Sequence, residues 1–342
     1  MFILRKNPKE ILRTPNASFF YITSRCLCST TDTDEKAKLE FTDPDKPTSA
    51  HYDQLVNIAG HSRDFTTLHY LLNKRTKDGC FNTTNTFKFI TGAEDDLSDL
   101  IQTLSRLDKG FARKSAFDAL IARFCKLDQT ERSLRLIDTM IRGEHGINAC
   151  TFHPILNALT RKKSMEEARC VLALMKDNGI TPDVTSYNYI LTAYCVAGDL
   201  EAAAGVLREI LEEGLEVDPR TYDAMVLGAC KAGRVEGALA LLRRMVDDGV
   251  PALYSTHAHV INWLMKLGCF GQAVELVLSY GGIDKGLDTE NFGFLGRCLM
   301  RARRFKEAKL VLGEMDKRGL VMGQKLRTDY AELLQKPIKV TK

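Results

Sequence analysis

The sequence lacks most of the features that mark membrane proteins and enzymes. No uninterrupted apolar run approaches about 18 residues, so a membrane-spanning helix is not expected. A phosphate-cradling Gly-rich loop, a Ser-His-Asp arrangement, a carboxylate pair and the zinc-deaminase motifs H-x-E and P-C-x-x-C are all missing. The sequence therefore predicts a protein that is not an enzyme.

The ten cysteines lack the spacing of a metal site or a disulfide framework. They include no C-x-x-C pair, and His257 and His259 have no partner set nearby. Cys26 and Cys28 lie in a segment that is expected to be removed. Three others recur at one place on the apolar side of a predicted helix, where we expect core thiols: Cys125, Cys195 and Cys230. No metal and no cofactor is predicted.

Acidic residues are scarce only at the amino terminus. Residues 1–31 contain one acid, Glu10, and five cations: Arg5, Lys6, Lys9, Arg13 and Arg25. Subtracting these from the totals of 44 and 48 leaves 43 acids and 43 cations in the rest of the chain. Because the body is neutral, any binding of nucleic acid must come from local rows of charge.

The cationic, acid-poor start is typical of a targeting peptide. We predict a mitochondrial transit peptide over residues 1–29, with a plastid peptide or a disordered cytosolic tail as alternatives. The apolar clusters are broken by Pro8, Pro15 and charges, which argues against a secretory signal. Residues 30–48 are polar and turn-rich and predict a flexible linker.

From residue 114 onward the chain resembles itself at a step of 35 residues. Alanines recur at this step: Ala168, Ala203, Ala238, Ala273 and Ala308. Aromatic residues open most units, with His257 in one of them: Phe117, Phe152, Tyr187, Tyr222 and Phe292. Apolar residues within each unit recur at helical spacing around a central turn, which is a glycine in three units: Gly198, Gly233 and Gly268.

Each unit is therefore predicted to be an antiparallel pair of helices that approach closely at the recurrent alanine. One pair cannot bury its apolar faces alone, so the pairs are expected to stack into an all-α solenoid. The predicted array covers 49–323, with units 49–83, a shortened 84–113, 114–148, 149–183, 184–218, 219–253, 254–288 and 289–323. Residues 324–342 predict a capping helix and a tail.

The phrases ITPDVTSYNYILTAYCVAGDLEAA, VDPRTYDAMVLGACKAGRVEGALALLRRM and RFKEAKLVLGEMDKRGL resemble pentatricopeptide repeats of the simple 35-residue (P-type) class found in plant organelles. The resemblance covers about 275 of the 342 residues. It implies a right-handed superhelix that acts on organellar RNA.

The resemblance also implies that the fifth and last residues of a unit read one RNA base, since both project into the groove. The corresponding pairs are Asp118 with Asn148, His153 with Asp183, Asn188 with Asp218, Asp223 with Leu253, Ala258 with Asp288, Gly293 with Gly323, and Asp53 with Thr83. Only Asn188 with Asp218 matches a familiar pair, which implies uracil. The second residues are mostly not the usual valine: Ser115, Cys150, Thr185, Arg220, Ser255 and Glu290. A solvated groove without base reading is the competing interpretation.

Five units carry a cation near the end of the first helix: Lys126, Arg161, Lys231, Lys266 and Arg301, with Val196 as the exception. The resemblance implies that a residue at this position can contact phosphate. The competing explanation is that a cation at a helix C-terminus gains about 0.3–1 kcal/mol from the dipole.

Three functions remain open on the sequence. The first is binding of single-stranded mitochondrial RNA in transcript stabilisation, processing or translation. The second is a structural role in a mitochondrial ribosome, with contacts to rRNA and proteins but no base reading. The third is a protein-only scaffold.

Overall fold

The computed structural model describes residues 47–92 and 97–335, which belong to one compact unit, Asp43–Lys342. The predicted transit peptide lies outside the described residues, as do residues 30–46 of the predicted linker and residues 336–342 of the predicted tail.

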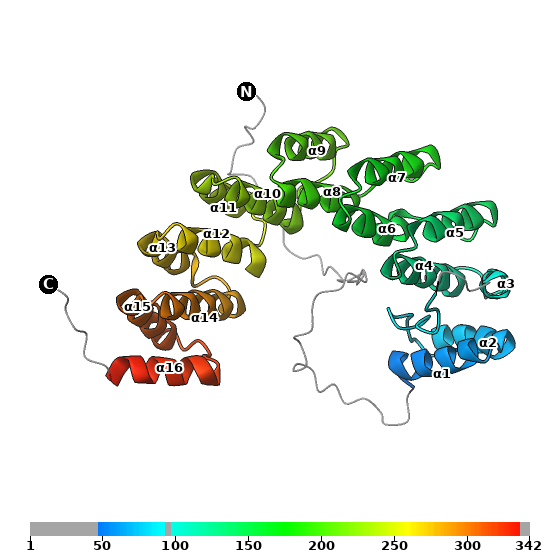
Figure 1. Ribbon diagram of the computed structural model, residues 1–342, viewed down its shortest axis with the longest axis horizontal. Helices are drawn as coiled ribbons and strands as arrows, with labels where there is room; N and C mark the ends of the chain where they lie inside the picture. Colours follow the sequence, from blue (N-terminus) through cyan, green and yellow to red (C-terminus); the bar gives the residue numbers. More distant parts are fainter. Residues whose placement is uncertain (1–46, 93–96, 336–342) are drawn as a thin grey trace, which may run out of the picture. The chain divides into compact units, whose positions relative to one another are not determined.

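The described residues form α-helices joined by short turns, and no strand occurs among them (Figure 1). The helices are α1 (Ser49–His61), α2 (Phe65–Lys77), α3 (Ser98–Ser105), α4 (Phe111–Lys126), α5 (Thr130–Arg142), α6 (Ala149–Arg161), α7 (Met165–Asp177), α8 (Val184–Ala197), α9 (Leu200–Glu212), α10 (Pro219–Lys231), α11 (Val235–Asp247), α12 (Tyr254–Lys266), α13 (Phe270–Tyr280), α14 (Lys285–Arg301), α15 (Phe305–Lys317) and α16 (Gln324–Gln335). Among these described helices, none combines the length and the apolar character needed to cross a bilayer.

The helices stack as pairs, which confirms the predicted α-solenoid. Each first helix packs against its own second helix and against the first helix of the next pair, in the order α4, α6, α8, α10, α12 and α14. All first helices therefore run in the same direction, and their equivalent residues lie side by side. The recurrent alanines are buried in this packing, as expected for the closest approach of two helices: Ala168, Ala203, Ala238, Ala273 and Ala308.

Helix ends are set by local capping. The Asp183 side chain accepts the backbone N–H of Ser186 at the start of α8, and the helix ends at Gly198, whose φ of 82° is left-handed. Asp199 then caps α9 by accepting the N–H of Ala202. The same left-handed turn recurs in every pair, in four of them without glycine: Arg63, Asp128, Lys163 and Arg303. There it costs each side chain about 1 kcal/mol.

Between α2 and the start of α4 at Phe111, the described residues form one α-helix, α3, instead of a helix pair. The stretch after Asn82 makes consecutive turns, and helix α3 follows. Polar side chains compete for the backbone here: the Thr83 amide donates to the Thr86 hydroxyl at 2.8 Å, and the Asn57 side chain holds Phe89 N–H at 2.7 Å. Phe87 and Ile90 remain buried, so the turns still fill the stack.

A second irregularity separates α13 from α14. Helix α13 ends at Tyr280, Gly282 adopts a φ of 112°, and α14 begins at Lys285, before the predicted unit start at 289. The Asp288 carboxylate accepts the backbone N–H of Gly282 at 2.7 Å and so closes this turn. Helix α14 therefore begins about one turn before the predicted start of its unit.

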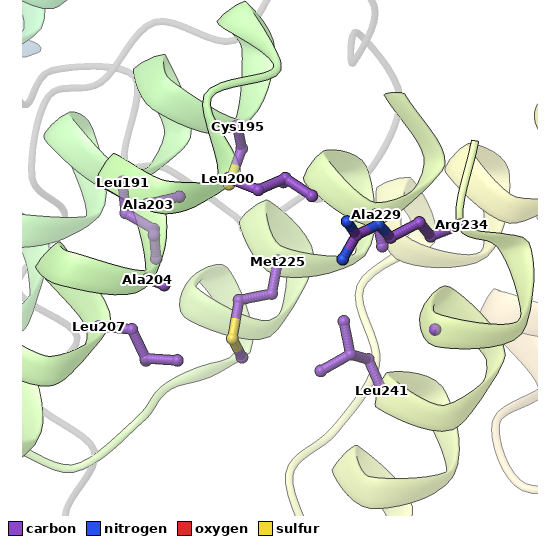
Figure 2. A pocket seen from close by; sticks show the side chains of 11 residues that line it. Leu191, Cys195, Leu200, Ala203, Ala204, Leu207, Met225, Ala229, Arg234 and Leu241 are labelled. Atoms are coloured by element: carbon purple, nitrogen blue, oxygen red, sulfur yellow. The ribbon is translucent and has the colours of Figure 1, made fainter. Parts of the chain in front are cut away.

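The buried core is divided along α10. Ala224 belongs to the amino-terminal cluster of buried side chains, and Val226 belongs to the carboxy-terminal cluster. An apolar cavity of about 320 Å³ lies at the division. Figure 2 shows Met225 of α10 between Leu207 of α9 and Leu241 of α11. Helices α9 and α11 are therefore less closely packed against each other here than the first helices α8 and α10 are.

The contact between α8 and α10 generates a stability prediction. A Cβ added at Gly228 of α10 would lie 2.9 Å from the Cys195 sulfur and 3.1 Å from the Cys195 Cβ of α8. We expect Gly228→Ala to lower the free energy of unfolding by about 1 kcal/mol or more, because overpacking costs about 1–3 kcal/mol and outweighs the gain in helix propensity. Urea unfolding followed by circular dichroism measures this change.

Gly205→Ala in α9 is the matched control. A Cβ at Gly205 meets nothing within 4 Å, so the same propensity gain should raise the stability by about 0.5–1 kcal/mol. Equal effects of the two substitutions would contradict the close approach of α8 and α10.

Candidate nucleic-acid interface

The last residue of a predicted unit lies directly before the next first helix. Asn148, Asp183 and Asp218 are the N-cap residues of α6, α8 and α10. The fifth residue lies on the second turn of the preceding first helix, which packs alongside. The N-cap position therefore places the last residue of a unit near the fifth residue of the same unit. The candidate site is built on ordinary helix capping.

Asn188 and Asp218 are joined in this way. The Asn188 amide donates to Asp218 Oδ1 at 2.9 Å, and the Thr221 hydroxyl donates to Asn188 Oδ1 at 2.8 Å. Asp218 Oδ1 also accepts the Thr221 backbone N–H at 2.8 Å. One N–H of Asn188 and the second oxygen of Asp218 take no part in these bonds, so the pair keeps one unused donor and one unused acceptor, although Asn188 itself is buried.

His153 and Asp183 form the second joined pair. His153 is 3% exposed, and its Nε2 lies 2.9 Å from Asp183 Oδ1, which also accepts the backbone N–H and the hydroxyl of Ser186, each at 2.8 Å. Burial raises the pKa of Asp183, but the bonds from His153 and Ser186 outweigh burial and hold that pKa at about 2. The Cys150 thiol lies beside this pair.

The pair Asp118 and Asn148 is arranged differently. Asp118 pairs with Lys114 one turn earlier, at 2.5 Å, and Asn148 forms a capping box with Thr151. Among the described residues, no hydrogen bond joins Asp118 to Asn148. In this unit the fifth residue forms an ion pair within its own helix, whereas in the next two units the fifth and last residues are joined by a hydrogen bond.

In the first unit, the predicted base-reading residue Asp53 is engaged by a buried cation, Arg75. Asp53 accepts from the Thr83 and Thr86 hydroxyls and forms an ion pair with Arg75 at 2.9 Å, with side chains 8% and 1% exposed. Arg75 also donates to the Ser49 carbonyl at 2.9 Å. Breaking such a buried pair leaves an uncompensated charge, so Asp53 is held away from any ligand.

The remaining units offer little for a base edge. Asp223 accepts from the Thr256 hydroxyl at 2.8 Å and lies 3.7 Å from His259 Nε2, and its predicted partner Leu253 has no polar side chain. Asp288, the predicted partner of Ala258, holds the Gly282 turn. Gly293 and Gly323 have no side chains.

The five predicted phosphate contacts are Lys126, Arg161, Lys231, Lys266 and Arg301, which we call the cation row. Each is the exposed final residue of a first helix: α4, α6, α10, α12 and α14, respectively. Because the first helices stack in parallel, these ends lie on one side of the array. The cation row takes part in none of the ion pairs found among the described residues. Its charges are therefore not neutralised by neighbouring carboxylates.

Sequence reasoning missed two features of this surface. One is the buried Arg75, which closes the first pair. The other is the approach of Cys150 to His153 and Asp183; the signal was the C-x-x-H spacing at the start of a helix, which places Cys150 and His153 on one face.

The architecture defines a class, the helical-repeat proteins whose stacked pairs form one extended surface. Comparisons with known proteins then give the family. The model for "Pentatricopeptide repeat-containing protein" matches residues 91–210, and two models for "PPR repeat" match residues 213–246 and 292–320.

Two Arabidopsis thaliana proteins are similar over most of their length. "Pentatricopeptide repeat-containing protein At3g56030, mitochondrial" is 49% identical over 83% of this chain and 83% of its own. "Pentatricopeptide repeat-containing protein At2g40240, mitochondrial" is 50% identical over 84% of this chain and 83% of its own. This chain belongs to the pentatricopeptide repeat family. Both names carry the mitochondrial location that residues 1–29 predict.

Among solved structures, the chain is similar to the pentatricopeptide repeat protein PPR10 in complex with an 18-nt psaJ RNA element. The identity is 17% and the TM-score 0.49, over 84% of this chain and 41% of that one.

Because the pKa of Asp183 is low, we predict that the stability of the fold depends on pH. The test uses protein from which metal ions have been removed. The pKa of Asp183 in the folded protein is about 2 and lies below the ordinary aspartate pKa of 3.8, so the stabilisation is present above about pH 4 and is lost as the pH falls toward 2. Asp183→Asn keeps an N-cap but loses the charge. Since 40% of the Asp183 side chain is exposed, we discount for solvent screening and expect a loss of roughly 1 kcal/mol near pH 7.

Urea unfolding from pH 7 to pH 3 measures this difference. The gap between the wild type and Asp183→Asn should narrow as the pH falls below about 4. A gap that stays constant across this range would show that the charge of Asp183 does not stabilise the fold.

Proposed function

We propose that this protein binds single-stranded mitochondrial RNA along its stacked first helices. The protein is mitochondrial, and it acts as a binding module in RNA metabolism, in transcript stabilisation, processing or translation, without catalysing a reaction itself. The observation that carries the proposal is the cation row, whose five charges end five of the six first helices from α4 to α14, with α8 as the exception, and are not paired with carboxylates.

The physical basis is the regular spacing of phosphates along RNA. Cations that neutralise phosphates release condensed counterions, which gives affinity without sequence preference. If these cations only stabilised the helix dipoles, they would not need to be exposed or free of ion pairs. The neutral body of the chain makes such a local row the main source of electrostatic attraction.

Base reading is proposed for two units, at Asn188 with Asp218 and at His153 with Asp183. Each pair places polar groups from two adjacent first helices within 2.9 Å of each other. The remaining donor and acceptor of the Asn188 pair match the edge of a uracil, as the family resemblance implies.

A structural role at the mitochondrial ribosome is the second candidate. It is favoured by the engagement of Asp53, Asp118 and Asp288 in contacts within the protein, which leaves few units able to read a base. Under this alternative the cation row contacts rRNA backbone and other surfaces contact ribosomal proteins.

The cation row generates the first test. Replacing Lys231, Lys266 and Arg301 with Ala should weaken binding to a short single-stranded RNA and lower the slope of log affinity against log salt by roughly 2, or about 0.7 for each lost phosphate contact. Fluorescence anisotropy of labelled RNA over a range of salt concentrations measures both quantities.

The matched control replaces Arg243, Lys306 and Lys317, which are exposed on second helices α11 and α15. It removes the same residue types and the same charge. An equal loss of affinity and slope in both triple variants would mean that the cation row has no special part in binding.

Base reading is tested at Asn188. The wild type should bind a uridine-containing RNA several-fold more tightly than the same RNA with adenosine in those places, and Asn188→Ala should lose most of that preference. Asn178→Ala, at the C-cap of α7, is the control and should keep it. Salt-dependent binding with no base preference in the wild type would favour the structural candidate instead.

A further inference from the structure

Three potential metal ligands converge between two adjacent units. The Cys150 sulfur, a His153 ring nitrogen and an Asp183 carboxylate oxygen lie within 4.8 Å of one another. Cys150 and Asp183 are half-buried, and His153 is 3% exposed. The cluster is therefore partly shielded from water but open on one side.

The fold brings these residues together from different segments. Cys150 and His153 are separated by one helical turn on α6 and point to the same side. Asp183 precedes α8, which packs against α6. Ser186 holds Asp183 in place through its backbone N–H and its hydroxyl, each at 2.8 Å. Such outer contacts orient a ligand before any ion arrives.

The combination of donors is specific to one unit. The equivalent second and fifth positions of the next unit hold Thr185 and Asn188, which are poor metal ligands, although Asp218 is retained. Cysteine at the second position and histidine at the fifth occur together only at Cys150 and His153 in the predicted units. The cluster is thus not a property of the repeat itself.

We propose that Cys150, His153 and Asp183 bind a zinc ion. A thiolate, an imidazole and a carboxylate suit Zn²⁺, whereas Mg²⁺ and Ca²⁺ prefer oxygen ligands alone. Three protein ligands leave a fourth tetrahedral position, which water fills on the open side. Zinc binding does not require RNA, but zinc at this site competes with a base for His153 and Asp183, the groups proposed to read a base in this unit.

Binding requires small changes in the three side chains. Zinc takes the Cys150 sulfur as thiolate, so the thiol proton passes to solvent. His153 binds as a neutral imidazole and gives up its bond to Asp183. Ligand atoms around a tetrahedral zinc ion lie about 3.3–3.6 Å apart, so the 2.9 Å contact opens by about half an ångström. The N-terminal end of the α6 dipole stabilises the thiolate charge.

Cobalt absorption tests the proposal on the full, metal-free protein without RNA. Co²⁺ should bind at about one ion per chain and give the near-ultraviolet thiolate-to-cobalt charge-transfer band, and Zn²⁺ should abolish that band by displacing cobalt. Mg²⁺ in excess should not displace it. Cys150→Ser should remove the band, and Asp183→Asn should weaken zinc binding about tenfold or more.

Cys170→Ser is the matched control, since Cys170 is an exposed thiol on α7 of the same unit. It should leave the band and the affinity unchanged. Circular dichroism of each variant confirms that the helices are retained. A band that is absent from the wild type, that persists in Cys150→Ser, or that disappears in Cys170→Ser would overturn the proposal, whatever the outcome of the RNA experiments.

Discussion

The lateral packing of one first helix on the next is the contact on which the other features of this protein depend. A single helix pair leaves apolar surface exposed, so the free energy of burial comes from stacking. One close approach is at Gly228, which allows α10 to approach the Cys195 side chain of α8. Because the first helices then lie parallel, equivalent residues fall into rows, and both the cation row and the joined polar pairs result from that geometry.

The polar pairs show how folding and recognition compete for the same atoms. Asp183 and Asp218 cap helices, and a cap uses carboxylate lone pairs that a base could otherwise engage. Asp53 is the extreme case, because its carboxylate is engaged by buried Arg75 and by two threonine hydroxyls. Equivalent positions therefore differ between units. In some units polar groups are available to a ligand, and in others they are engaged in contacts within the protein.

The fold followed closely from periodicity, because alanines and aromatic residues at a step of 35 have to face a common core. The buried ring positions agree, and His257 takes the place of an aromatic ring in one unit, where burial lowers its pKa. Periodicity did not predict the turns after Asn82 or the early start of α14 at Lys285. Both depend on local side-chain bonds that no spacing rule describes.

The helix pairs, their repetition and the residues at equivalent positions were predictable from the sequence, because they depend on apolar spacing and capping within about 35 residues of chain. Which of the equivalent residues meet depended on the packing of neighbouring helices. His153 reaches Asp183 and Asn188 reaches Asp218, whereas Asp118 turns to Lys114. The physical reason is that hydrogen bonds and ion pairs form over distances of about 3 Å, which depend on how neighbouring helices pack.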